Sequence, residues 1–581
     1  MSRQVSSRPV SGPRAPRRSR ALTVAVALIL GLLLAVFLLW PLVDAVRGAF
    51  VDANGRATFA YMAMVFRNPL YREGFRNALA LAFWSTLVAA FVGTTAAVLL
   101  DRFEFPGRRL FATLAPLPLM LPPFVGAVGV RQLLGNQGVL NALLAHLHVI
   151  DPLHPIDWLR HGRFATVVAL TAMHLYPIVY LNVRAALAGL NVELEEAAAS
   201  LGCRGLRRFR KITLPLLGPS LFAATSIVFI WGLTELGVPL MCDYSRVTSV
   251  QIFSGLKDIS RNPFVFGLVV VVLVATVTIY AGARWLVGRS PVAGSTKGAR
   301  VRRPTRLRPL AAAAVVLVLS TFVGVAALPN LGVVLSAFAR DWYGTVLPAG
   351  LTLGHVRAAV GHDMVVPSIG NSLRYVTLST VFDLVVGTAI AWLVVRTRSR
   401  LATAIDVAAM LPLAVPGLVM AFGYLSISRE GHVLAFLNPV RDPTALLVIA
   451  YAVRRLPFVV RSAAAGLTQV SVTLEEAAAS LGAGARRVFT RVTLPLLAPH
   501  LLAGGIFAFA LSMLEVSDSL ILAQRQDTYP ITKAIFELYA LLGDGHQVAA
   551  ALGLWAMLFL IAAVAFARAI LGRRDGGLFK L

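Results

Sequence analysis

Leu194–Gly202 reads LEEAAASLG, and the same nine residues recur at Leu474–Gly482. A second string, TLPLL, follows each copy at the same distance, at Thr213–Leu217 and at Thr493–Leu497. Two such matches at one fixed spacing indicate an internal repeat, so we expect the chain to consist of two related halves. Within each copy, glutamate and alanine favour helix and the glycine ends it, which predicts a short helix followed by a turn.

The repeat extends upstream of these strings. The matched residues there are Asn77 and Asn371, Gly93 and Gly387, Pro118 and Pro412, and Pro122 and Pro416. These pairs lie 294 residues apart, whereas the LEEAAASLG copies lie 280 residues apart. The first half therefore carries an insertion, which falls around the histidine-rich stretch near Leu153.

The composition indicates that much of the chain lies in a lipid bilayer rather than in water. Of 581 residues, 57% are hydrophobic and only 14% are charged, with a mean hydropathy of +0.76, far more apolar than an average soluble protein. Runs of about 20 apolar residues, long enough to cross a hydrocarbon core of roughly 30 Å, recur along the chain. The twelve candidate spans are 21–43, 77–100, 110–130, 164–183, 217–240, 264–287, 310–335, 371–395, 401–424, 445–465, 497–520 and 548–567. We predict an all-α, polytopic membrane protein with two parallel-repeat halves.

The formal net charge of +27 raises the question of nucleic acid binding. However, the basic residues fall in short segments between apolar runs, and these segments alternate along the chain as they do in cytoplasmic loops. Membrane topology explains the charge, so we expect no nucleic acid partner and both termini in the cytoplasm.

The same pattern divides the chain into five parts. We predict a basic tail at 1–20, six spans in 21–288, a cytoplasmic linker at 289–309, six more spans in 310–572 and a tail at 573–581. The linker is rich in Gly, Ser, Pro and Arg and has no apolar periodicity, which is typical of a flexible connection.

Each repeated loop contains Glu-Ala-Ala, three residues, Gly, nine residues, Ile or Val, one residue and Leu-Pro. The residues concerned are Glu196, Ala197, Ala198, Gly202 and Pro215 in the first copy, and Glu476, Ala477, Ala478, Gly482 and Pro495 in the second. This pattern resembles the EAA loop of the binding-protein-dependent inner-membrane permeases of ABC importers. The resemblance covers essentially the whole chain, once in each half, and implies the type I importer permease fold.

The resemblance also implies partners. In that family the loop forms a coupling helix that docks on a separate ATPase subunit. Two loops imply two ATPase copies, with an extracytoplasmic solute-binding protein delivering a small-molecule or metal-ion substrate through the bacterial inner membrane. No stretch matches the phosphate-binding loop GxxxxGK[ST], so we expect ATP on the partner subunit and neither cofactor nor catalytic residue on this chain.

Charged residues inside spans are costly and mark candidate pathway residues. Glu235 and Glu515 occupy equivalent positions in the fifth and eleventh spans, and Arg454 lies near the middle of the tenth, with His174 at the matching place in the fourth. The arginine would either meet an anion or pair with Asp383 or Glu515. Internal pairing is the favoured interpretation, because buried charges usually find partners first.

Prolines interrupt two of the predicted spans. Pro118 and Pro122 fall in the third span, and Pro412 and Pro416 fall in the ninth. Since proline removes a helical hydrogen bond, these spans are expected to be broken or kinked, and the breaks would either shape the pathway or simply accommodate packing.

Three histidines crowd the inserted loop of the first half, at His146, His148 and His154, together with Asp151 and Asp157. These are residue types that bind metals, but their spacing matches no compact metal-binding template. We therefore predict no metal site.

The cargo and the energy source leave alternatives open. The fused double layout resembles permeases for ferric iron, thiamine or phosphonates, with ferric iron leading; paired glutamates suit a cation and arginines suit an anion. An ion-driven secondary transporter would share the topology and the parallel repeat. It would not explain two matched EAA loops.

Overall fold

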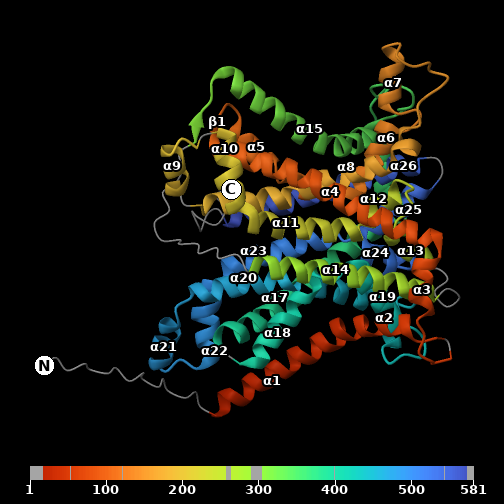
Figure 1. Cartoon of the computed structure of the whole chain (residues 1–581). Helices are drawn as coiled ribbons and strands as arrows, with labels where there is room; N and C mark the ends of the chain where they lie inside the picture. Colours follow the sequence, from red (N-terminus) through yellow and green to blue (C-terminus); the bar gives the residue numbers. More distant parts are fainter. Residues whose placement is uncertain are drawn as a thin grey trace.

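The computed structural model describes residues 17–52, 54–120, 122–190, 192–203, 205–256, 263–288, 304–397, 399–541 and 544–571. The described chain is almost entirely helical, which confirms the predicted fold class (Figure 1). The predicted C-terminal tail, residues 1–16 of the N-terminal tail and residues 289–303 of the linker lie outside the described residues.

The first half contains α1 (Arg17–Leu34), η1 (Ala35–Leu39), α2 (Trp40–Phe50), α3 (Ala60–Arg67), α4 (Pro69–Arg102), β1 (Phe103–Glu104), α5 (Arg108–Leu114), η2 (Leu117–Met120), α6 (Pro123–Leu134), α7 (Val139–His146), α8 (Trp158–Ala188), α9 (Val192–Ser200), α10 (Gly205–Arg208), η3 (Phe209–Thr213), α11 (Leu214–Thr234), α12 (Gly237–Met241), α13 (Thr248–Gly255) and α14 (Phe264–Gly288). The second half contains β2 (Thr305–Arg306), α15 (Pro309–Phe338), α16 (Gly354–Gly361), α17 (Val365–Arg396), α18 (Arg400–Met410), η5 (Leu411–Leu413), α19 (Gly417–Ile427), η6 (Ala435–Leu437), α20 (Thr444–Gln469), α21 (Val472–Ser480), α22 (Ala485–Val488), η7 (Phe489–Thr493), α23 (Leu494–Met513), α24 (Ser517–Leu522), η8 (Gln526–Thr528), α25 (Ile531–Ala540) and α26 (Gly545–Leu571).

Nine helical stretches of the described chain are long and apolar enough to cross a membrane unaided. Two further helix pairs bring the total to as many as eleven. The remaining predicted span, 445–465, is also helical and lies within α20. That helix carries Arg454, Arg455 and Arg461, more charge than an ordinary span contains.

The two helix pairs are the spans that the prolines interrupt. Arg108–Leu119 meets Pro123–His146 at 99°, and Arg400–Leu413 meets Gly417–Ile427 at 106°. Pro122 and Pro416 stand immediately before the second helix of each pair, where the missing N–H costs nothing. The predicted interruption of the third and ninth spans is therefore confirmed.

The first helices of the two halves are exchanged. The segment α1–α2 packs against α18 and α19 of the second half, and α15 packs against α6 of the first. Two equivalent glycines permit these crossings, because a Cβ atom at Gly129 would overlap the carbonyl oxygen of Pro329, and one at Gly423 the carbonyl oxygen of Pro41. The exchange ties the halves together along both flanks.

Hydrogen bonds reinforce the crossing between the halves. The Tyr424 hydroxyl donates to the Phe37 carbonyl oxygen at 2.7 Å, and the Ser426 hydroxyl donates to Asp44 at 2.6 Å. The end of the predicted linker is also engaged, since β2 pairs in parallel with β1 and Leu307 N–H donates to the Glu104 carbonyl at 3.3 Å.

Because the exchanged helices hold the halves together, cleaving the linker is expected to leave them associated. A protease site placed between Thr296 and Lys297, outside the described residues, would be cut in native membranes. Affinity capture of a tagged N-terminal half in mild detergent should then recover the C-terminal half in equal amount. Separation of the halves would show that the linker itself holds the assembly together.

Candidate functional site

The two repeated loops have the same backbone. Each consists of a nine-residue helix (α9 or α21), a four-residue helix (α10 or α22) and a five-residue π-helical turn (η3 or η7) that leads into α11 or α23. Figure 1 shows α9 and α21 at the same end of the bundle, opposite α7 and α13. We call this the loop end.

A left-handed glycine ends each short helix. Gly202 has φ 81° and Gly482 has φ 82°, a conformation that other residues adopt only at a cost. The residues that follow donate backbone hydrogen bonds back to Ala198 at 2.9 Å and to Ala478 at 3.1 Å. These bonds make a Schellman cap in both copies, so the glycines predicted to end the helices do so.

The first glutamate of each copy fastens its helix to the bundle. Glu195 accepts from the Arg102 guanidinium at 2.7 Å and from the Thr213 hydroxyl at 2.5 Å. In the second copy, Glu475 accepts from Arg396 and from Thr493, both at 3.0 Å. Each acid thus links its short helix to the end of α4 or α17 and to the start of the next span.

The second glutamate of each copy faces outward. Glu196 and Ala197 are exposed, as are Glu476 and Ala477, whereas Ala198 is buried and Ala478 half-buried. Pro215 and Pro495 are exposed and start α11 and α23. The outward face therefore presents the glutamate and the alanine that follows it, and the third EAA residue turns toward the bundle.

Four further residues of these loops were not identified from the sequence. Glu195 and Glu475 are the fastening acids, and Leu201 and Leu481 are 88% and 90% exposed beside the capping glycines. A signal was present, because Arg102 matches Arg396 and Thr213 matches Thr493 at the spacings of the repeat.

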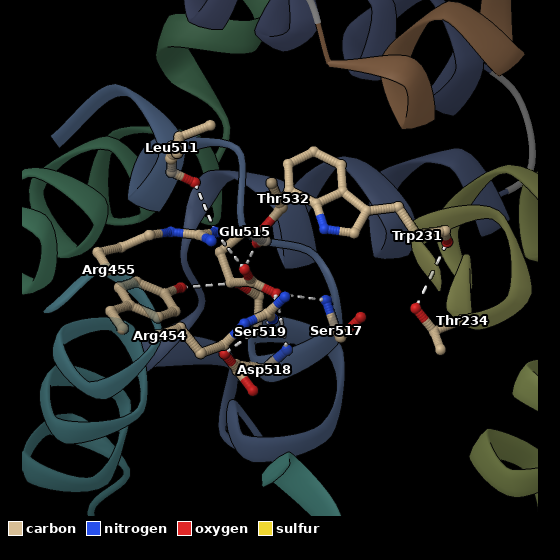
Figure 2. Close-up of polar contacts among 11 residues, drawn as sticks. Trp231, Thr234, Arg454, Arg455, Leu511, Glu515, Ser517, Asp518, Ser519 and Thr532 are labelled. Carbon is tan, nitrogen blue, oxygen red and sulfur yellow. Dashed lines mark hydrogen bonds and ion pairs between the residues drawn. The ribbon is translucent and has the colours of Figure 1, made fainter. Parts of the chain in front are cut away.

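A charged cluster lies between α20 and the segment that follows α23 (Figure 2). The Glu515 carboxylate accepts from Arg454 and, at 2.5 Å, from Arg455, and Arg454 also donates to Asp518 at 3.2 Å. Arg455 donates in addition to the Leu511 carbonyl at 2.9 Å. The internal pairing of Arg454 with Glu515 is therefore found, whereas Asp383 is not its partner.

Asp383 contributes to the same region from α17. Its side chain is almost fully buried, and neither carboxylate oxygen has a hydrogen-bond partner in the described chain. It interacts electrostatically with Arg455.

Glu235 occupies the equivalent place in the first half. Its carboxylate accepts from the Val238 N–H at 3.2 Å, just as Glu515 accepts from the Ser517 N–H at 3.1 Å. Glu235 also interacts electrostatically with Glu515 and Arg454 across the boundary between the halves. Three of the four pathway candidates thus lie in one region.

His174, the fourth candidate, contacts the broken span of the first half rather than the charged cluster. Its Nδ1 lies 3.0 Å from the Pro118 carbonyl oxygen, at the break between η2 and α6. The first half has Leu175 and Val238 where the second has Arg455 and Asp518, so only one of the two acids that engage Arg454 has an acidic equivalent there, namely Glu235.

A cavity of about 470 Å³ lies beside this cluster, and residues of both halves line it. Its lining includes four pairs of equivalent residues from the two halves: Leu119 and Leu413, Ile178 and Phe458, Ile227 and Phe507, and Trp231 and Leu511. The walls are mainly apolar. Along α11 and α23 the cavity residues precede Glu235 and Glu515, so the charged cluster lies beyond the cavity, away from the loop end.

The inserted loop is a surface feature. His154 Nδ1 lies 3.0 Å from Asp151, and both side chains are exposed. The backbone N–H of Leu153 and the side chain of His154 hold the pKa of Asp151 below its usual value. Within the described residues, no three His, Cys, Asp or Glu side chains gather into a group that would hold a metal ion.

Comparison with known proteins places the two halves in one family. The model of the binding-protein-dependent transport system inner membrane component matches residues 89–290 and 383–574, together about two thirds of the chain. The ferric transport system permease protein FbpB of Actinobacillus pleuropneumoniae is 26% identical, covering 84% of this chain and 69% of the relative. The Fe(3+)-transport system permease protein FbpB 2 of Haemophilus influenzae is 26% identical over 82% and 85%.

Shorter relatives match less than half of the chain. The sulfate transport system permease protein CysT of Salmonella typhimurium is 31% identical over 39% of this chain and 79% of its own length. Two family matches on one chain agree with the duplicated loops and the duplicated broken spans. The chain therefore belongs to the family of binding-protein-dependent transport system inner membrane components, as a fused two-domain permease of an ABC importer.

Proposed function

We propose that this chain forms the membrane pathway of a ferric iron importer, with one ATPase subunit docked on α9 and an identical one on α21. The main support is the match between the loops: the same helix, the same left-handed glycine and the same outward glutamate occur twice at one end of the bundle. Because α9 and α21 present matching surfaces, they suit two identical ATPase subunits.

The proposal fixes an orientation. The loop end is cytoplasmic, both termini lie on that side, and ATP binds to the partner subunits rather than to this chain. A solute-binding protein delivers cargo at the opposite end. The basic segments between spans support this orientation, because such segments stay in the cytoplasm.

Two observations support a cationic cargo. The two longest-matching relatives described above are named ferric or Fe(3+) transport permeases. In addition, the region beyond the cavity holds four carboxyl groups, from Glu235, Asp383, Glu515 and Asp518, against the two guanidinium groups of Arg454 and Arg455. The arginines are already engaged by acids, which argues against their serving as a free anion site.

The geometry suggests how transport proceeds. Transporters built of two parallel halves change access when one half rocks against the other around a central site. Here residues of both halves line the cavity. In the cluster beyond it, Glu235 of the first half interacts electrostatically with Arg454 and Glu515 of the second. ATPase closure at the loop end would move α9 and α21 together and separate the halves at the cluster.

Uptake of radioactive ferric iron tests the cargo. Proteoliposomes would contain the complete complex with internal ATP, and the cognate binding protein would be supplied outside with iron. Iron accumulation that stops without ATP is the expected result. Accumulation of thiamine or a phosphonate instead would keep the importer and replace its cargo, and accumulation driven by an ion gradient without ATP would overturn the proposal.

The fastening of the loops gives a further prediction. Replacing Arg102 by methionine is expected to destabilise the attachment of α9 by up to about 3 kcal/mol, since it breaks a buried ion pair. The same change at Arg396 should cost α21 less, because the Glu475 side chain is 19% exposed and that of Glu195 only 3%. Hydrogen exchange of the α9 and α21 amides, followed by mass spectrometry, measures both effects. Equal loss of protection in R102M and R396M would contradict this difference.

A further inference from the structure

An apolar groove of about 670 Å³ opens beside the first loop. Its walls come from the last part of α4, from α10, η3 and α11, and from the β1–β2 pair, which has no counterpart among the described residues. Phe91 and Leu206 on its lining are about two thirds exposed. In a chain that crosses a membrane, such exposed apolar side chains face lipid.

The length of the groove matches one leaflet. It runs along α4 from Ala90 to Arg102, roughly 18 Å at the rise of an α-helix. Half of a typical hydrocarbon core is about 15 Å. The groove therefore extends from the membrane surface at the loop end to about the middle of the bilayer.

A cation stands at the surface end of the groove. Arg208 lines it, and its Nε is buried without a hydrogen-bond partner among the described residues. The Thr94 hydroxyl, further along the wall, is also buried without a partner. An apolar channel with an unsatisfied guanidinium donor at headgroup depth fits a molecule with a hydrophobic tail and an anionic head.

The repeat offers an internal comparison. The residue equivalent to Arg208 is Val488, which is half-buried as Arg208 is, so the second half has no cation at this position. The groove is also next to the fastened loop, because the Arg102 guanidinium lies over the Phe209 ring at 5.7 Å and both residues line it.

We propose that this groove binds one anionic phospholipid, with its phosphate at Arg208 and an acyl chain along α4. The bound lipid contacts the residues that hold α9 and so stabilises the first loop but not the second. This inference depends neither on the cargo nor on the number of ATPase subunits.

Native mass spectrometry of the purified chain tests the proposal. The protein would be released from nanodiscs that contain equal amounts of phosphatidylglycerol and phosphatidylcholine, and the lipids that remain bound would be counted. The wild-type chain is expected to retain one phosphatidylglycerol at least fivefold more often than one phosphatidylcholine. R208V should lose this preference, and R487V, which removes an exposed arginine from the second loop, should keep it.

A second variant tests the acyl channel separately. Val98 lines the groove and is half-buried, so V98W fills the channel while Arg208 stays in place. V98W is expected to lose the retained lipid as R208V does. Equal retention of both lipids by the wild type, or an unchanged preference in R208V, would overturn the proposal. Loss in R208V without loss in V98W would also overturn it, because the lipid would then bind outside the groove.

Discussion

Replacing Glu196 and Glu476 together by lysine is expected to reduce ATP-driven uptake at least tenfold while the chain still inserts and folds. Both residues are exposed and contribute to the outward face of their helices, so the change disturbs little of the bundle. At a docking surface, by contrast, two reversed charges oppose the partner, and each such reversal typically costs several kcal/mol. Uptake and ATP hydrolysis would be measured together in proteoliposomes.

The matched control is E430K, because Glu430 is a well-exposed acid remote from the loops that pairs only with Arg441 among the described residues. E430K should transport as the wild type does. Each single variant, E196K or E476K, should keep one intact surface and show an intermediate defect. Normal uptake by the double variant would count strongly against docking at these helices.

Replacing Glu515 by leucine is expected to destabilise the folded chain by about 3–5 kcal/mol, the cost of leaving buried charges without their partner. Glu515 accepts from Arg454 and Arg455 and is itself nearly inaccessible, with 5% of its side chain exposed. Thermal unfolding in detergent should show a much lower midpoint for E515L. The cooperative transition of the wild type provides the reference.

The equivalent glutamate of the first half is the control for this experiment. Glu235 has no ion pair within the described residues, and glutamine there keeps an oxygen for the Val238 N–H. E235Q should therefore unfold near the wild-type temperature. If the unfolding midpoints of E235Q and E515L fall by the same amount, the two positions contribute equally to stability. The asymmetry of the cluster would then have no energetic consequence.

Much of the fold follows from the repeat and the prolines. The LEEAAASLG strings predict two short helices ended by glycine, and both are found with Schellman caps. Pro122 and Pro416 predict two broken spans, and both pairs bend by about 100°. Such features depend on local backbone chemistry, which a single sequence expresses directly.

Other features depend on how distant segments meet. Successive helical residues point about 100° apart, so the sequence alone does not tell whether Glu195 or Glu196 faces the bundle. Glu195 faces the bundle because its carboxylate accepts hydrogen bonds there from Arg102 and Thr213. The sequence alone likewise does not predict the exchange of α1–α2 and α15 between the halves. The glycines that permit the close crossings, Gly129 and Gly423, are nevertheless equivalent positions in the repeat.

The pathway candidates illustrate the same limit. His174 stands where the second half has Arg454, and symmetry alone assigns them a common role. Their neighbours differ, however: the acids that engage Arg454 are Glu515 and Asp518, and the place of Asp518 is taken by Val238 in the first half. The histidine contacts the Pro118 carbonyl oxygen instead, a contact that no sequence pattern predicts.

The stoichiometry of the intact complex is the most direct test of docking at two equal loops. Native mass spectrometry of the complex, captured on this chain under conditions that preserve weak contacts, gives the number and identity of its subunits. One copy of this chain with two identical ATPase subunits is the predicted composition. A stable chain that transports without capturing any ATPase would contradict it and favour a secondary transporter.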